Sequence, residues 1–164
     1  MFDPIRALEV LLKHKVRFVV IGGFAGRLWG SNSITNDLDL CYARDDKNLE
    51  VLAAALRELH ARLRGAPPDL PFLLDARTLK AGDHFTFVTK YGGLDCLGTP
   101  SGSAGFPDLA RGAKEMVVGS IRVPVAALAD IIRLKRVAGR PKDLVEVEVL
   151  AALQEEIERS RRKS

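Results

Sequence analysis

Residues 21–40 read IGGFAGRLWGSNSITNDLDL, and they are the most informative part of the chain. Just before it, Val16–Ile21 is short, β-branched and almost continuously apolar, which is typical of a strand covered on both faces. At the far end, Asp37–Tyr42 alternates acidic or small residues with large apolar ones. Because side chains of a strand alternate between its faces, Asp37 and Asp39 are predicted to share one face while the leucines enter the core.

The two ends of this stretch suit phosphate and metal chemistry. Gly22 and Gly23 follow the first strand and precede a helix predicted from Ala25. Glycines at that place let the backbone approach a phosphate, and free amides at the start of a helix supply donors. The carboxylates of Asp37 and Asp39 are spaced about 6.6 Å along their strand, so both can reach hard divalent ions. A pair of such ions about 4 Å apart stabilises the attacking and leaving oxygens during displacement at phosphorus.

Asp95 is the candidate third carboxylate. It lies within the apolar segment 93–97, the second arm of a hairpin predicted from Phe85–Thr89 and Leu94–Leu97. An acid in such a strand needs a metal, a donor or an exposed position, because burying it unpaired is costly. Each feature has a commoner explanation when taken alone: Asp95 as an exposed strand residue, the acidic pair as a solvent-facing edge, and the glycines as a turn. Their ordered combination favours a phosphate and metal site.

The remaining patterns predict an α+β fold, a small mixed β-sheet with helices packed on it and a pair of helices at the C-terminus. We expect a single domain, 1–164, with its core in 15–100 and its C-terminal helices in 125–159. The individual expectations are an opening helix over 4–14, a long helix from 45 or 46 to 63, a short helix around 108–113, an edge hairpin over 117–123, and closing helices over 125–138 and 141–159.

Composition limits the compartment and the kind of partner that the protein can have, but it does not identify a partner. The chain has 164 residues, 47% of them hydrophobic, with a formal net charge of +4. This excess of positive charge permits a polyanionic partner but does not require one. Cys41 and Cys96 form no Cys-x-x-Cys pair, and no apolar run reaches the roughly 18 residues that span a bilayer. We therefore expect a cytoplasmic protein with no membrane association.

Taken together, the two ends of the chain resemble the nucleotidyltransferase fold of the DNA polymerase beta type, in particular the minimal bacterial members of the AbiEii and MenT toxin group. Ile21-Gly22-Gly23 and Asp37-Leu38-Asp39-Leu40 are similar to the front motif of that group. Residues 130–135 and 139–144 look like its closing lysine helix and its Arg-x-Lys-Asp segment. The resemblance covers residues 15–155, and the two motifs together are considerably more specific than the front motif alone.

The resemblance implies roles for particular residues. Asp37 and Asp39 would hold magnesium, two ions in all, and Asp95 would be the third ligand that helps to activate the acceptor hydroxyl. Lys135 would face the phosphates, although its helical spacing fits a solvent-facing lysine equally well. Asp143 would anchor the start of the last helix or take part in the site. Gly22 and Gly23 would cradle the triphosphate of a nucleoside triphosphate (NTP).

One position departs from the family pattern. Many relatives have an arginine four residues before the first aspartate, where this chain has Ser33. Contact with the triphosphate would then be weaker at Ser33 or supplied by Arg27. This departure puts the nucleotide preference and the rate in question.

The resemblance also implies an activity: a magnesium-dependent nucleotidyltransferase that modifies the 3′ end of tRNA as the toxin of a bacterial toxin–antitoxin pair, with a cognate antitoxin protein as partner. Two alternatives stay open. The acceptor is a protein or an aminoglycoside, or the chain is a catalytically idle nucleotide-binding module, for which Ser33 is the best argument. Turnover of NTP separates the enzymes from the idle module.

Overall fold

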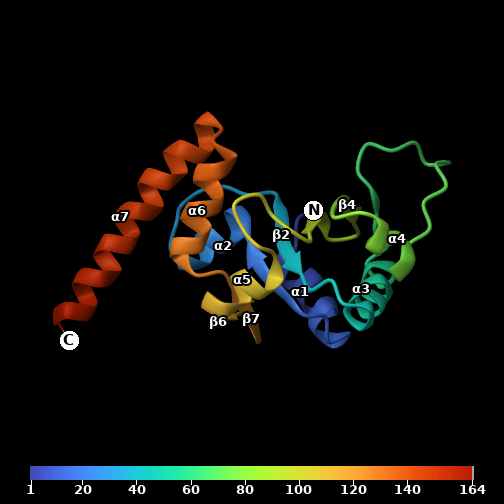
Figure 1. Cartoon of the computed structure of the whole chain (residues 1–164), viewed down its shortest axis with the longest axis horizontal. Coiled ribbons are helices and arrows are strands. Elements are labelled where there is room, and N and C mark those ends of the chain that lie inside the picture. The colour runs from blue at the N-terminus through green and yellow to red at the C-terminus, as the bar shows by residue number, and fades with distance from the viewer. Residues whose placement is uncertain (164) are drawn as a thin grey trace.

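A computed structural model describes residues 1–163 of the chain (Figure 1). These residues form one seven-stranded mixed sheet in the order β3-β4-β5-β2-β1-β7-β6, with helices packed around it. This architecture confirms the predicted α+β fold class. The elements in chain order are α1 (Pro4–Lys13), β1 (Phe18–Ile21), α2 (Gly22–Trp29), β2 (Asp37–Tyr42), α3 (Asp46–Glu58), β3 (Arg62–Leu63), α4 (Ala76–Ala81), β4 (His84–Thr89), β5 (Gly92–Leu97), α5 (Phe106–Gly112), β6 (Lys114–Val118), β7 (Ile121–Val125), α6 (Leu128–Ala138) and α7 (Pro141–Lys163).

Strand β2 lies at the centre of the sheet and sets the geometry of the acidic residues. It pairs antiparallel with β1, where Ile21 is the partner of Asp39. On its other side it pairs parallel with β5, where Asp39 is the partner of Asp95 and Asp37 is the partner of Gly93. Neighbouring residues in register point to the same face of a sheet, so the pairing brings the two aspartates of β2 and the one of β5 together.

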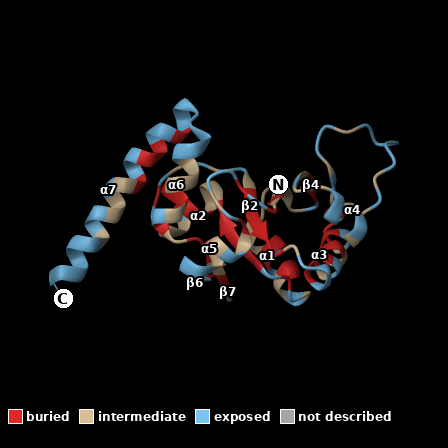
Figure 2. Cartoon of the chain, viewed as in Figure 1, coloured by how far each residue is buried: buried red, intermediate tan, exposed pale blue. Residues whose placement is uncertain are grey.

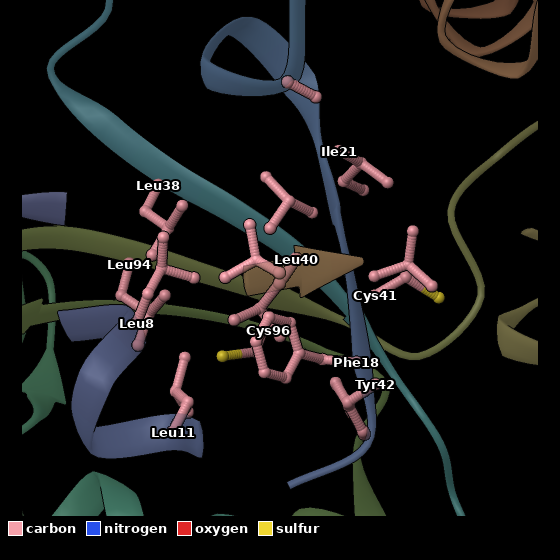
Figure 3. Close-up of a cluster of buried hydrophobic side chains, with 14 of the residues drawn as sticks. Leu8, Leu11, Phe18, Ile21, Leu38, Leu40, Cys41, Tyr42, Leu94 and Cys96 are labelled. Carbon is pink, nitrogen blue, oxygen red and sulfur yellow. The ribbon is translucent and has the colours of Figure 1, made fainter. Parts of the chain in front are cut away.

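The leucines of β2 lie on its opposite face, in the core. Leu38 and Leu40 are at most 1% exposed and pack with Leu8 of α1 and Leu94 of β5 (Figure 3). Figure 2 shows buried residues, in red, in the strands at the centre of the molecule. In Figure 3, Ile21 lies on the other side of the strand from these leucines, the side that also carries Asp39. The alternation of Asp37–Tyr42 therefore places the leucines on one face and the aspartates on the other, as the sequence predicts, and Cys41 further along the acidic face is buried.

Helix α7 runs along one end of the molecule and is anchored to the loop before β2 (Figure 1). Glu146 of α7 is 9% exposed and accepts hydrogen bonds from the hydroxyls of Ser31, at 2.8 Å, and of Ser33. Since that loop leads directly into Asp37, the last helix helps to fix the start of the acidic strand.

Several sequence-based boundaries are wrong. The long helix ends at Glu58 and not at Leu63, because the chain reverses at His60, which has a positive φ of 54°, and Leu63 then pairs with Phe87 of β4. Leu63 fitted the apolar helical stripe, but its apolar side chain serves a strand. The hairpin predicted over 117–123 spans 114–125 and joins the main sheet through the pairing of Val125 with Val20, so α6 begins only at Leu128. Helix α4 was not predicted.

None of the helices within residues 1–163 combines the length and the apolar composition that crossing a membrane requires.

Candidate active site

The three predicted carboxylates meet on one face of the sheet. Asp39 and Asp95 are register partners, and Asp95 lies close enough for its negative charge to raise the pKa of Asp39. Asp37 lies one side-chain repeat away on the same face of β2 and is close enough to raise the pKa of both other acids. The pairing of β2 with β5 thus produces the convergence that the sequence could only suggest.

Crowding of these acids changes their protonation. Burial, followed by the negative charge and hydrogen bond of Asp95, raises the pKa of Asp39 to about 7. Burial also raises the pKa of Asp95, although the guanidinium of Arg64 acts in the opposite direction. The protonated form of Asp39 is therefore favoured to a higher pH than is usual for an aspartate.

Two glycines make room for the carboxylates. A Cβ atom at Gly22 would stand 2.0 Å from Oδ2 of Asp39, and Gly22 also has a positive φ of 74°, which side-chain-bearing residues rarely adopt. A Cβ atom at Gly93 would stand 2.1 Å from Oδ1 of Asp37. Gly22 was predicted to approach a phosphate, but what touches it in the structure is a carboxylate of the site. It starts α2 directly, so Gly22 and Gly23 form the first helical turn.

Lys135 and Asp143 extend the site from the C-terminal helices. The Lys135 ammonium on α6 lies close enough to lower the pKa of both Asp39 and Asp143. Asp143 is 3% exposed, accepts hydrogen bonds from the backbone and guanidinium of Arg140, and caps the start of α7. Burial acts to raise the pKa of Asp143, but its pairing with Arg140 outweighs burial and holds that pKa below its usual range.

The predicted triphosphate contacts Ser33 and Arg27 lie elsewhere. The hydroxyl of Ser33 donates a hydrogen bond to Glu146, so it attaches the loop before β2 to α7. Arg27 is exposed on α2 and lines a hollow of about 400 Å³ together with Phe2 and Phe24, and none of the three aspartates lines that hollow. The structure therefore groups Gly22, the three aspartates and Lys135, and leaves these two side chains outside that group.

Sequence reasoning missed two residues that contact the aspartates. Arg64 lies between Asp37 and Asp95, with Nη2 3.3 Å from Oδ1 of each. The hydroxyl of Thr35 donates a hydrogen bond to the backbone carbonyl of Asp37 at 3.0 Å. The same side chain lies next to Gly23, where an added Cβ atom would stand 3.2 Å from its Oγ1. A lone arginine in a loop-rich segment carries no motif, so only the three-dimensional pairing of β3 with β4 could reveal it.

The residues fit a divalent cation in kind. Carboxylate oxygens are the ligands that magnesium prefers, and Oδ1 of Asp95 is buried without a hydrogen-bond partner. Within residues 1–163, however, no group of three or more His, Cys, Asp and Glu side chains is already arranged around a metal position. Carboxylates of the right kind are present, and the guanidinium of Arg64 lies between two of them.

Comparison with known proteins bears on the fold of the chain. No family model and no curated protein sequence matches the chain. Among solved structures, the lincosamide antibiotic adenylyltransferase LnuA superimposes with a TM-score of 0.58 at 14% identity, over 92% of this chain and 95% of LnuA. The antibiotic-resistance factor ANT(2″)-Ia gives a TM-score of 0.52 at 17% identity, over 98% and 94% of the two chains. TM1012 from Thermotoga maritima, provisionally described as a nucleotidyltransferase, gives 0.51 at 15% identity, over 97% and 96%.

These similarities extend over nearly the whole of each chain, so they concern the complete fold and not a single motif. The chain has the nucleotidyltransferase fold. At such low identities the similarity concerns the fold, and any activity must be argued from the residues of the site.

Proposed function

We propose that this chain is a divalent-metal-dependent nucleotidyltransferase. The observation that carries the proposal is the register of β2 with β5, which places Asp95 beside Asp39 on the face that Asp37 shares. The nucleotidyltransferase fold of the chain supports the same conclusion. Asp37, Asp39 and Asp95 would hold two magnesium ions, and Gly22 and Gly23 would receive the triphosphate at the start of α2.

The transfer would proceed by displacement at the α-phosphorus. The acceptor hydroxyl oxygen forms the new bond to phosphorus, the bond to the β-phosphate bridging oxygen breaks, and pyrophosphate leaves. Oδ1 of Asp95, buried and without a hydrogen-bond partner, can accept the proton of the attacking hydroxyl. Lys135 would attract the negatively charged phosphates from α6. When bound, magnesium would neutralise the triphosphate and stabilise the attacking and leaving oxygens.

For the acceptor we propose the 3′ end of tRNA, with the chain acting as the toxin of a bacterial toxin–antitoxin pair that has a cognate antitoxin. The net charge of +4 suits a polyanionic acceptor, and the resemblance of residues 15–155 to the AbiEii and MenT group points to tRNA.

A hydroxyl on an antibiotic is the second candidate acceptor. It is favoured by the similarity in fold to LnuA and to ANT(2″)-Ia, whose structure was also solved with adenylyl-2″-tobramycin. That complex matches over 92% of this chain at 19% identity with a TM-score of 0.51.

One experiment tests the activity and separates the acceptors. Purified protein with magnesium is given each labelled NTP in turn, together with total tRNA, tobramycin or lincomycin. Transfer of label by the wild type, but not by Asp39→Ala, supports the proposal. The labelled product identifies the acceptor. Binding of NTP without formation of pyrophosphate with any acceptor would favour the idle module. Growth arrest by the wild type but not by Asp39→Ala would support the toxin.

A further inference from the structure

The side chain of Arg64 fills the space between Asp37 and Asp95. Its Nη2 atom lies 3.3 Å from Oδ1 of each aspartate and donates a hydrogen bond to the carbonyl of Phe87 at 3.2 Å. The backbone amide of Arg64 donates to Thr86 at 2.9 Å, so the residue is attached to β4. The guanidinium is therefore placed by the sheet.

The sheet also leaves room for this guanidinium. A Cβ atom at Gly93 would stand 2.4 Å from Nη2 of Arg64, so any larger residue there would push the guanidinium away. Gly93 does not have a positive φ, so glycine is not needed there for the backbone conformation. Its small size leaves room for the guanidinium of Arg64. The position of Arg64 thus depends on a residue two strands away.

The contact balances charge but leaves one oxygen unsatisfied. Oδ1 of Asp95 lies near Nη2 of Arg64 and yet has no hydrogen-bond partner. A guanidinium attracts both carboxylates, whereas a divalent ion binds carboxylate oxygens directly at about 2.0–2.6 Å. Arg64 therefore lowers the repulsion among the acids without meeting their full capacity to bind a cation.

We propose that Arg64 is a displaceable counter-ion of the metal site. It neutralises Asp37 and Asp95 while no metal is bound, and a divalent cation must displace it from them. The inference rests on the proposed function, since it concerns how the metal reaches these carboxylates. Because the guanidinium and the metal carry like charges, Arg64 weakens metal affinity and stabilises the metal-free site.

The test measures binding of Mn²⁺, as a spectroscopic substitute for magnesium, to wild type, Arg64→Gln and Arg62→Gln at mildly alkaline pH. Arg62→Gln is the control, because Arg62 is an exposed arginine of β3 two residues before Arg64 and its substitution removes the same charge. Arg64→Gln should bind Mn²⁺ about tenfold more tightly than wild type, the order of effect expected for removing one nearby like charge. Arg62→Gln should bind like wild type.

Thermal unfolding gives a second readout that does not depend on activity. Without metal, Arg64→Gln should unfold at a lower temperature than Arg62→Gln, and Mn²⁺ should raise its melting temperature more than that of wild type. Arg64→Lys keeps the charge and should bind Mn²⁺ no more tightly than wild type. Binding to wild type with no gain in Arg64→Gln would overturn this inference and leave the proposed function standing. Absence of Mn²⁺ binding in every variant would overturn both.

Discussion

Gly22→Ala should destabilise the chain and disrupt its acidic site. The new Cβ would fall 2.0 Å from Oδ2 of Asp39 and 2.8 Å from its Cβ, so the Asp39 side chain must leave its place beside Asp95. The positive φ of 74° adds backbone strain of about 1–2 kcal/mol. With the displacement of Asp39, we expect unfolding by urea to show a loss of about 3 kcal/mol.

Gly119→Ala is the matched control for this experiment. Gly119 also has a positive φ, 60°, in the turn between β6 and β7, but its Cβ would meet only Ile5, at 3.5 Å. It should therefore lose only the backbone contribution, about 1 kcal/mol. Equal losses of unfolding free energy in the two variants would refute the claim that the Asp39 carboxylate packs on Gly22.

Three further predictions concern protonation and packing. Since the pKa of Asp39 is raised to about 7, the folded metal-free protein holds this proton more tightly than the unfolded chain, and its stability should fall as pH rises from the usual aspartate pKa to about 7; in urea titrations Asp39→Asn should show a smaller slope, because the raised pKa of Asp95 acts in the same direction. Asp143, whose pKa is lowered by Arg140, should behave oppositely, its contribution being lost on acidification below its usual pKa, and Asp143→Asn should lower the free energy of unfolding by about 2 kcal/mol at neutral pH. Ser33→Ala should cost about 1–2 kcal/mol by removing one hydroxyl from buried Glu146, whereas Ser120→Ala in the exposed β6–β7 turn should be neutral in the same titration.

Local patterns predicted the centre of this fold well. The alternation of Asp37–Tyr42 and the apolar run ending at Ile21 fixed which residues face the core, because strand periodicity depends only on neighbours along the chain. Asp95 was predicted because Asp37 and Asp39 call for a third carboxylate, and it is the acid that lies within a nearby apolar strand. Its pairing with Asp39 is a long-range choice of register, which no local pattern encodes.

The parts that were missed depend on contacts between distant segments. Leu63 satisfies a helical stripe as well as a strand, and only the available edge of β4 decides between them. Arg64 and Gly93 carry no motif, since each acquires its role from the other and from Asp37. Ser33 was considered as a phosphate contact, but Glu146, far along the chain, accepts its hydrogen bond.

The central claim is that Asp37, Asp39 and Asp95 together bind divalent cations beside a nucleoside triphosphate. A crystal structure grown with Mn²⁺ and a non-hydrolysable NTP tests it most directly, through the anomalous signal of the metal. We predict metal peaks in contact with all three aspartates, with the triphosphate at Gly22–Gly23. Metal bound elsewhere, or triphosphate bound while the Asp95 carboxylate contacts no metal, would contradict it.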